Sequence, residues 1–282
     1  MKTKKINRSW YGNILSFAVL VGFAFVMILP LVFAINNAFK PLDEIFLFPP
    51  RFFVINPTFR NFSDLFAIMS NSWIPFSRYF FNTVFVTFVG TLGHVIFASA
   101  AAYPLAKHKF PGSDWMFRIV VLSLMFNPMV TQIPNFMIIA GLGWLDTYAA
   151  IIVPAFAAPL GLYLMKQFME RIPDTMIEAA KIDGASEFRI YWTIIMPMVK
   201  PAWLTLLILM FQTLWGATGT TFIFSEELKT MHFAVSQILQ GGIARAGAAA
   251  AVGVLLMIVP ITVFIVSQSN IIETMASSGM KE

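Results

Sequence analysis

The chain has 282 residues, of which 58% are hydrophobic and only 12% are charged, and its mean hydropathy is +0.76. An ordinary soluble domain has about 25% charged residues, so this composition excludes a soluble domain and indicates an integral membrane protein. The net charge of +5 comes from basic residues spread over loops, which argues against a nucleic-acid-binding stripe. The absence of cysteine excludes disulfides and thiolate metal sites.

Six windows of 19 residues or more lack Asp, Glu, Lys and Arg. A transmembrane helix needs about 20 apolar residues, so each window predicts one helix. We therefore predict an all-α integral membrane protein with a single transmembrane domain over residues 1–282. The six expected helices are 14–35, 78–103, 116–141, 147–169, 201–224 and 247–268.

The basic residues predict the orientation of these helices, because Lys and Arg are enriched in cytoplasmic loops. With the N terminus in the cytoplasm, 13 of the 19 basic residues lie inside. Both termini are therefore expected to be cytoplasmic. The six basic residues left outside are Lys40, Arg51, Arg60, Arg78, Lys229 and Arg245.

The first helix carries Pro30, which predicts a kink. Its apolar run is longer than that of a signal peptide, and no clear cleavage site follows, so we expect it to be retained. The external segment 36–77 that follows is rich in Phe, Pro and Trp. We expect these aromatic side chains to lie at the headgroup layer and against neighbouring helices.

His94 lies within the second helix, without a carboxylate or a second histidine at helical spacing. We interpret it as a packing histidine and predict no metal site, although ionisable groups inside a membrane are candidates for function.

The third helix is interrupted by Pro128 and Pro134 and carries four polar side chains. Burying unpaired amides in lipid is costly, so these side chains should face either a wet cavity or a neighbouring helix. Both alternatives stay open. The substrate-path candidates of this helix are Asn127, Thr131, Gln132 and Asn135.

The fifth helix carries a second set of polar residues. Gly216 and Gly219 weaken the helix in this region, so backbone and hydroxyl groups become available to a solute. Its substrate-path candidates are Gln212, Thr213, Trp215 and Thr218.

The segment 170–200 lies between the fourth and fifth helices and is dense in charge. Gly184 divides it into two short helices, since glycine readily takes the left-handed backbone that ends a helix. Ser186 or Asp183 is expected to cap the second helix, which runs toward Met196 and Pro197. Ala179, Ala180, Ile182 and Phe188 are expected to form a small apolar contact face. The product is a helix–turn–helix on the inner membrane surface, shaped to bind another protein.

The order Glu178-Ala179-Ala180, then Gly184, Ile194 and Met196-Pro197 resembles the cytoplasmic EAA loop of ABC importer permeases. The family ends this motif in Leu-Pro, so Met196 is a conservative departure. The run Ile182 to Ser186, IDGAS, is similar to the carbohydrate branch, typified by the second membrane subunit of the maltose permease. The resemblance also covers FKPLDEIF near Phe39 and AAYPLAKHKFPG at Ala101–Gly112, and so most of the chain.

This resemblance implies the type I importer permease fold and a set of partners. These are a second, homologous permease subunit in a heterodimer, two ATPase subunits and an extracytoplasmic solute-binding protein. The chain itself would bind no cofactor, while the ATPases use ATP and Mg. It would lie in the cytoplasmic membrane of a bacterium, with lipid around it and a sugar as its solute. The residues that the resemblance assigns to ATPase coupling are Glu178, Ala179, Ala180, Asp183, Gly184, Ser186 and Pro197.

The outer loop 226–246 matches a loop of the maltose system that reaches into the binding protein and helps to dislodge sugar. The resemblance therefore assigns binding-protein contact to Gln237, Gln240, Gly241 and Gly242. The alternative is an interfacial helix with apolar side chains such as Phe233 and Val235 facing lipid. Many carbohydrate permeases carry Trp-Asn-Asp before this loop, whereas this chain has Trp215-Gly216-Ala217.

An enzyme reading has no support, because the chain lacks GxxxxGK[ST], HExxH and GxSxG motifs. An ion-coupled carrier is disfavoured, because no Asp or Glu lies well inside a predicted helix. The sequence thus favours a permease subunit of an ABC importer, and its resemblance to the carbohydrate branch implies a sugar or oligosaccharide as the solute. The C-terminal residues resemble those of permeases linked to plant-polysaccharide fragments. The alternatives are a permease for another solute and a membrane scaffold or sensor subunit that does not transport.

Overall fold

The computed structural model describes residues 10–70, 73–242 and 245–279, which form helices and no strand. Internal contacts divide the chain into two compact units. Unit 1 comprises Met1–Asn71 and Gln237–Ile258, and unit 2 comprises Ser72–Ser236 and Val259–Glu282. The single domain expected over residues 1–282 stays a prediction, because a division by contacts does not define membrane domains. The cytoplasmic placement expected for the two ends falls largely on residues 1–9 and 280–282, outside the described ranges.

Unit 1 contains α1 (Trp10–Phe39), α2 (Leu42–Ile45), α3 (Arg60–Ser70) and the first part of α14 (Ala246–Gly279). Helix α1 is apolar on all sides, and most of its large side chains are exposed. It includes Pro30, as expected, and begins four residues before the predicted position. A helix of this kind is suited to a lipid environment.

The segment after α1 is held by two charged side chains that are almost fully buried. Lys40 is 2% exposed, and its ammonium donates to Asn37 Oδ1 at 2.8 Å and to the Arg51 carbonyl at 2.5 Å. Glu44 is 4% exposed and accepts from the Ile55 N–H at 2.8 Å. Because a buried charge is costly unless it is hydrogen-bonded, these contacts fold the segment onto itself. The headgroup-layer role of its aromatic side chains stays a prediction.

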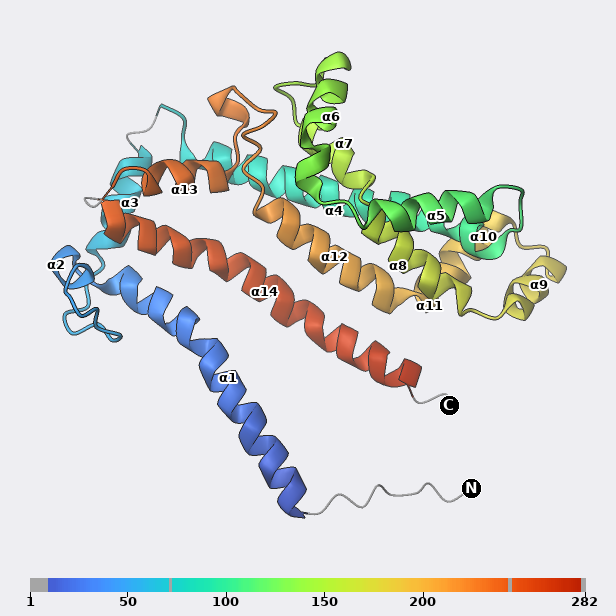
Figure 1. Ribbon diagram of the computed structural model, residues 1–282, viewed down its shortest axis with the longest axis horizontal. Helices are drawn as coiled ribbons and strands as arrows, with labels where there is room; N and C mark the ends of the chain where they lie inside the picture. The colour runs from blue at the N-terminus through green and yellow to red at the C-terminus, as the bar shows by residue number, and fades with distance from the viewer. Residues whose placement is uncertain (1–9, 71–72, 243–244, 280–282) are drawn as a thin grey trace. The chain divides into compact units, whose positions relative to one another are not determined.

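Unit 2 is organised around α4 (Phe76–Lys107), against which α7 (Ala149–Phe156), α8 (Pro159–Glu170) and α12 (Lys200–Trp215) pack (Figure 1). Glycines allow this close packing. A Cβ on Gly90 would lie 2.4 Å from Leu214 Cδ1, and one on Gly161 would lie 2.3 Å from His94 Nε2. Small residues thus serve interhelical contact in unit 2.

The expected third helix, 116–141, is two helices: α5 (Ser113–Ser123) and α6 (Pro128–Gly141). Asn127 is extended (φ −70°, ψ 131°) and its Oδ1 accepts from the Met129 N–H at 2.9 Å. A residue before proline avoids the helical region, and Pro128 at the first helical position suits a new start. The interruption expected at Pro128 is therefore a full break between two helices, and Figure 1 shows α6 leaving the line of α5.

The expected fifth helix is shorter than predicted and joins a bent neighbour. Helix α12 ends at Trp215, not at residue 224, because Gly216 follows and Gly219 takes a left-handed φ of 67°. At its start it meets the helical stretch Glu187–Met198 at a bend of 78°. Helix α14 continues to Gly279, beyond the predicted end at 268.

Among the described residues, four helical stretches are long and apolar enough to cross a membrane, and the bent pair raises this to five. They are Trp10–Phe39, Phe76–Lys107, Ala149–Glu170 and Ala246–Ser267, with Glu187–Met198 and Lys200–Trp215 as the pair. The one predicted span without such a stretch is the third, 116–141. It corresponds to α5 and α6, each of which is too short to cross a membrane alone. The six-helix count and the topology stay predictions.

Candidate functional site

The segment 170–200 forms the helix–turn–helix that the sequence predicts. Helix α9 (Asp174–Ile182) ends before Gly184, whose φ is 79°. Ser186 then caps α10 (Glu187–Ile190), its hydroxyl accepting from the Arg189 N–H at 3.4 Å. A π-helical turn, η1 (Tyr191–Ile195), and α11 (Met196–Met198) complete the segment. Both local predictions, the left-handed glycine and the serine cap, are confirmed.

One face of this segment is buried in a hydrophobic core cluster of unit 2. Ile177, Ala180, Ile190 and Ile195 are 0–9% exposed and pack with residues of α4, α8 and α12, such as Met169. Ala180 was expected on the outward contact face, and that placement was wrong. It lies three residues after Ile177, on the inward face of α9.

The opposite face combines charge with exposed apolar side chains. Glu178, Ala179 and Asp183 are exposed, while Ile182 is 87% and Phe188 is 74% exposed. Phe188 extends this face through Trp192, with their ring centroids 6.3 Å apart. Apolar side chains grouped in a charged, water-facing segment mark a protein interaction site. Pro197 is also exposed, at the start of α11.

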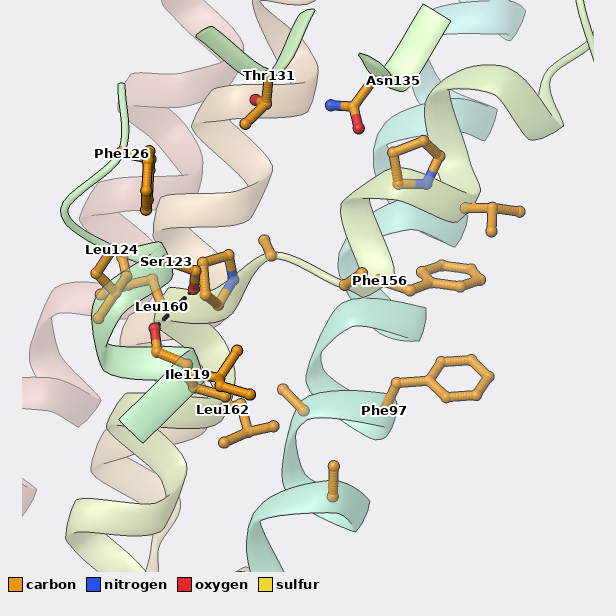
Figure 2. A pocket seen from close by; sticks show the side chains of 18 residues that line it. Phe97, Ile119, Ser123, Leu124, Phe126, Thr131, Asn135, Phe156, Leu160 and Leu162 are labelled. Atoms are coloured by element: carbon orange, nitrogen blue, oxygen red, sulfur yellow. Dashed lines mark hydrogen bonds between the residues drawn. The ribbon is translucent and has the colours of Figure 1, made fainter. Parts of the chain in front are cut away.

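A second candidate site is a pocket of about 1160 Å³ in unit 2, formed where two helices are broken (Figure 2). The α5–α6 break contributes Phe126, and the α7–α8 break contributes Ala157 and Ala158. The polar side chains in its lining are Ser123, Thr131 and Asn135. Apolar groups make up the rest, from Phe97, Ala98, Ala101, Ile119, Val120, Leu124, Val153, Pro154, Phe156, Pro159, Leu160 and Leu162.

The pocket brings together only two of the eight substrate-path candidates. Thr131 and Asn135 share one face of α6, as expected, and Figure 2 shows them together at one end of the pocket. Asn127 instead caps α6, and Gln132 Nε2 donates to Thr221 Oγ1 at 3.3 Å.

The candidates of the fifth predicted helix do not line this pocket. Gln212 and Thr213 are exposed on α12, and Thr213 Oγ1 donates to the Leu209 carbonyl at 2.9 Å. Trp215 is 4% exposed and stacks on Phe211. Thr218 lies beyond the end of α12, 3.3 Å from Thr220 through their hydroxyls.

The outer loop contains η2 (Glu226–Leu228) and α13 (Met231–Leu239). Phe233 and Val235 are each 7% exposed, so the alternative in which they face lipid is wrong. Gln237, Gln240, Gly241 and Gly242 are exposed. Their contact with a binding protein stays a prediction, and residues 243–244 lie outside the described ranges.

The base of this loop is fixed to α4 by contacts that the sequence did not reveal. Asn82 is fully buried, and its amide donates to the carbonyls of Glu227 and Lys229, each at 2.8 Å. Its Oδ1 accepts from the Tyr148 hydroxyl at 2.6 Å. Thr83 Oγ1 accepts from the Met231 N–H at 2.7 Å.

A further contact that sequence reasoning missed surrounds Asp146, which has a φ of 60°. Its carboxylate accepts from the N–H groups of Phe224 at 3.0 Å and Ser225 at 2.8 Å, and from the Ser225 hydroxyl. The hydrogen bonds from Ser225 hold the pKa of this carboxyl below its usual range. The positive φ of Asp146 marks this position as unusual for a residue other than glycine, but a backbone angle cannot be seen in the sequence.

His94 is a satisfied packing histidine, as expected. It is 1% exposed, and its Nδ1 lies 2.8 Å from the Ala155 carbonyl. In a continuous helix this carbonyl would accept from residue 159, but Pro159 has no N–H. His94 therefore supports the break between α7 and α8 that helps to form the pocket. No group of three or more metal-ligating side chains occurs in the described parts of the chain.

The fold agrees with the comparisons to known proteins. Residues 94–276 match the family described as "Binding-protein-dependent transport system inner membrane component". The match covers more than half of the chain, which therefore belongs to this family of ABC importer permeases.

Among curated relatives, Protein LplC of Bacillus subtilis is 32% identical over 180 residues, covering 64% of this chain and 59% of that protein. The arabinooligosaccharides transport system permease protein AraQ of Halalkalibacterium halodurans is 28% identical, covering 72% of this chain and 73% of AraQ. The sn-glycerol-3-phosphate transport system permease protein UgpE of Yersinia enterocolitica is 29% identical, covering 68% of each.

Among solved structures, a chain of a bacterial ABC transporter involved in the import of the acidic polysaccharide alginate has a TM-score of 0.78 and 23% identity. The superposition covers 93% of this chain and 98% of that chain. It shows that the two chains share the same fold.

Proposed function

We propose that this protein is the permease subunit of a bacterial ABC importer that moves an oligosaccharide across the cytoplasmic membrane. Family membership makes it an inner membrane component of a binding-protein-dependent system. The relative AraQ carries arabinooligosaccharides in its name, which supports a plant-polysaccharide fragment as the solute. A second permease subunit, two ATPase subunits and an extracytoplasmic binding protein complete the importer.

The exposed face of the EAA loop, residues 170–200, is the observation that carries this proposal. Covering a large apolar side chain is worth about 1.5–3 kcal/mol, so Ile182 and Phe188 favour a protein partner. Glu178 stands exposed on the same loop and is suited to pair with a basic residue of that partner. We assign this face to an ATPase subunit, which uses ATP and Mg, while this chain contributes no catalytic group.

The pocket supports the assignment of a solute path. Binding sites are commonly apolar and aromatic with a few placed polar groups, and this pocket has Thr131, Asn135 and Ser123 among aromatic side chains. The hydroxyl and amide groups are suited to sugar hydroxyls, and the rings of Phe97 and Phe126 to the apolar faces of a sugar. Specificity is shared with the second permease.

A different solute is the second candidate, because the relative UgpE carries sn-glycerol-3-phosphate in its name at nearly equal identity. Uptake of labelled arabinooligosaccharide and of labelled sn-glycerol-3-phosphate, in the native cell and in a strain that lacks this protein, separates the two. Loss of only the first supports an oligosaccharide.

Affinity purification from native membranes tests the importer assignment. A tag on this chain should recover a second permease and an ATPase. Glu178→Lys and Gly184→Leu should lose the ATPase but keep the permease, whereas Glu227→Lys, a matched charge reversal in the outer loop, should keep both. Recovery of neither partner with the wild type would favour a scaffold or sensor that does not transport.

A further inference from the structure

Glu187 occupies a junction between the EAA loop and α4. One carboxylate oxygen, Oε2, accepts from the Tyr103 hydroxyl at 2.7 Å and lies 3.6 Å from His108 Nε2. The other, Oε1, lies 2.6 Å from the Lys181 ammonium. Tyr103 lies in the last turns of α4, His108 is the residue that follows this helix, and Lys181 belongs to α9. One side chain of α10 thus joins both neighbouring elements.

A second contact between α4 and the EAA loop lies one helical turn before Tyr103, at Ser99. The hydroxyls of Ser99 and Tyr191 are 2.6 Å apart, and the Tyr191 ring lies 5.6 Å from the Tyr103 ring. Tyr191 directly follows α10. The two contacts together fix the orientation of α10 and η1 against α4.

The same stretch of α4 lines the pocket. Ala98 and Ala101 are pocket residues, and they alternate along the chain with Ser99 and Tyr103, which contact the EAA loop. A rigid helix that moves with the loop therefore also moves one wall of the pocket.

Stability alone does not account for this junction. The side chains of Lys181 and Glu187 are 46% and 48% exposed, and such ion pairs contribute little to folding. Tyr103, in contrast, is 7% exposed, so its hydroxyl needs the acceptor that Glu187 provides. The arrangement joins a buried group of α4 to a half-exposed group of the loop.

We propose that Glu187 is a positioning residue for coupling: it transmits displacement of the EAA loop to α4 and so to the pocket. This inference rests on the proposed function, in which an ATPase moves that loop. Glu187 itself does not need to touch the ATPase or the solute.

The test uses the complete transporter, purified through a tag on this chain and reconstituted in lipid, and needs no identified solute. The chain has no cysteine, so Ala101→Cys provides a single thiol in the pocket. Its rate of labelling by a maleimide is measured without nucleotide and after trapping with ATP and vanadate. With Glu187 intact, trapping should change the rate about fivefold or more, the lower range of typical coupling between sites.

In the Glu187→Ala background the ATPase should still co-purify and hydrolyse ATP, but the labelling rate should no longer respond. Tyr103→Phe, which keeps the ring and removes the hydroxyl, should weaken the response in the same direction and serves if Glu187→Ala folds poorly. The matched control is Glu170→Gln, since Glu170 is 42% exposed and pairs with Lys166 within α8. It should respond like the wild type.

A Glu187→Ala transporter that responds like the wild type would overturn the proposal, as would loss of the ATPase from that variant, which would make Glu187 a docking residue. Failure to recover any ATPase with the wild type is a different result. It would remove the proposed function itself.

Discussion

The two ends of α4 hold neighbouring segments by different chemistry. At the Phe76 end, the buried amide of Asn82 binds two loop carbonyls and a tyrosine hydroxyl. At the Lys107 end, the half-exposed carboxylate of Glu187 binds Tyr103 and Lys181. Neutral hydrogen bonds that are shut off from water fix a loop in place, whereas exposed ion pairs exchange readily with solvent. The first end is suited to a static support and the second to a segment that moves.

The largest expected effect is the loss of the buried amide. Asn82→Ala removes the side-chain partner of the Lys229 carbonyl and of the Tyr148 hydroxyl. It leaves the Glu227 carbonyl with only the bond from Arg78 Nε at 3.1 Å. We expect the free energy of unfolding to fall by about 3 kcal/mol, since each unsatisfied buried group costs about 1–3 kcal/mol. Thermal unfolding in detergent measures this. Gln132→Ala, which removes one exposed amide, is the control and should change little; equal losses would contradict the static support.

Between its two ends, α4 is held by close packing against α8, where Gly161 contacts His94. Gly161→Ala would place a Cβ 2.3 Å from His94 Nε2, and overpacking of this kind costs about 1–3 kcal/mol. Gly141→Ala, where no atom lies within 4 Å, is the matched control. The same unfolding assay should show a loss only for Gly161→Ala, and a neutral result there would mean that His94 is free to move.

At the Lys107 end, loss of charge should matter little for stability. Glu187→Gln keeps an oxygen for the Tyr103 hydroxyl and removes the ion pair with Lys181. We expect a change of less than about 1 kcal/mol in the free energy of unfolding, as for exposed ion pairs. A loss as large as that of Asn82→Ala would erase the difference between the two ends.

The smallest effect concerns pH at Asp174. Its carboxylate lies 2.7 Å from the Lys107 ammonium, and this hydrogen bond holds the pKa of the carboxyl below its usual range. A carboxyl with a lowered folded-state pKa stabilises the fold above its unfolded pKa of about 3.9. That contribution is lost as pH falls through the folded value. We therefore expect the free energy of unfolding, measured from pH 6 to pH 3, to fall less steeply with acid for Asp174→Asn than for the wild type.

Local signals predicted the EAA loop well. Gly184 and Ser186 act within a few residues of themselves, so their roles as helix end and cap follow from the sequence. The placement of Ala180 was wrong, although its spacing of three from Ile177 indicates the inward face. The break before Pro128 was also signalled, but it was interpreted as an interruption within one helix.

Long-range contacts escaped prediction. Asn82 is separated from Glu227 by 145 residues and Tyr103 from Glu187 by 84. Nothing near either residue indicates its partner, because helix packing alone decides which polar groups meet. The same holds for the pocket, which needs two helix breaks to face each other. Two of its polar residues were predicted, but the position of Ser123 was not.

Under the proposed function, an ATPase subunit covers the exposed face of the EAA loop, and one labelling experiment tests this directly. Because the chain has no cysteine, Phe188→Cys and Trp73→Cys each provide one thiol. These positions are 74% and 100% exposed. Phe188 lies in α10, next to Glu187, which contacts the Lys107 end of α4, and Trp73 precedes the Phe76 end of α4. Maleimide labelling of the detergent-purified protein is measured with its ATPase bound and after the ATPase is removed. We expect the ATPase to protect position 188 and to leave position 73 reactive. Equal labelling of position 188 with and without the ATPase would contradict it.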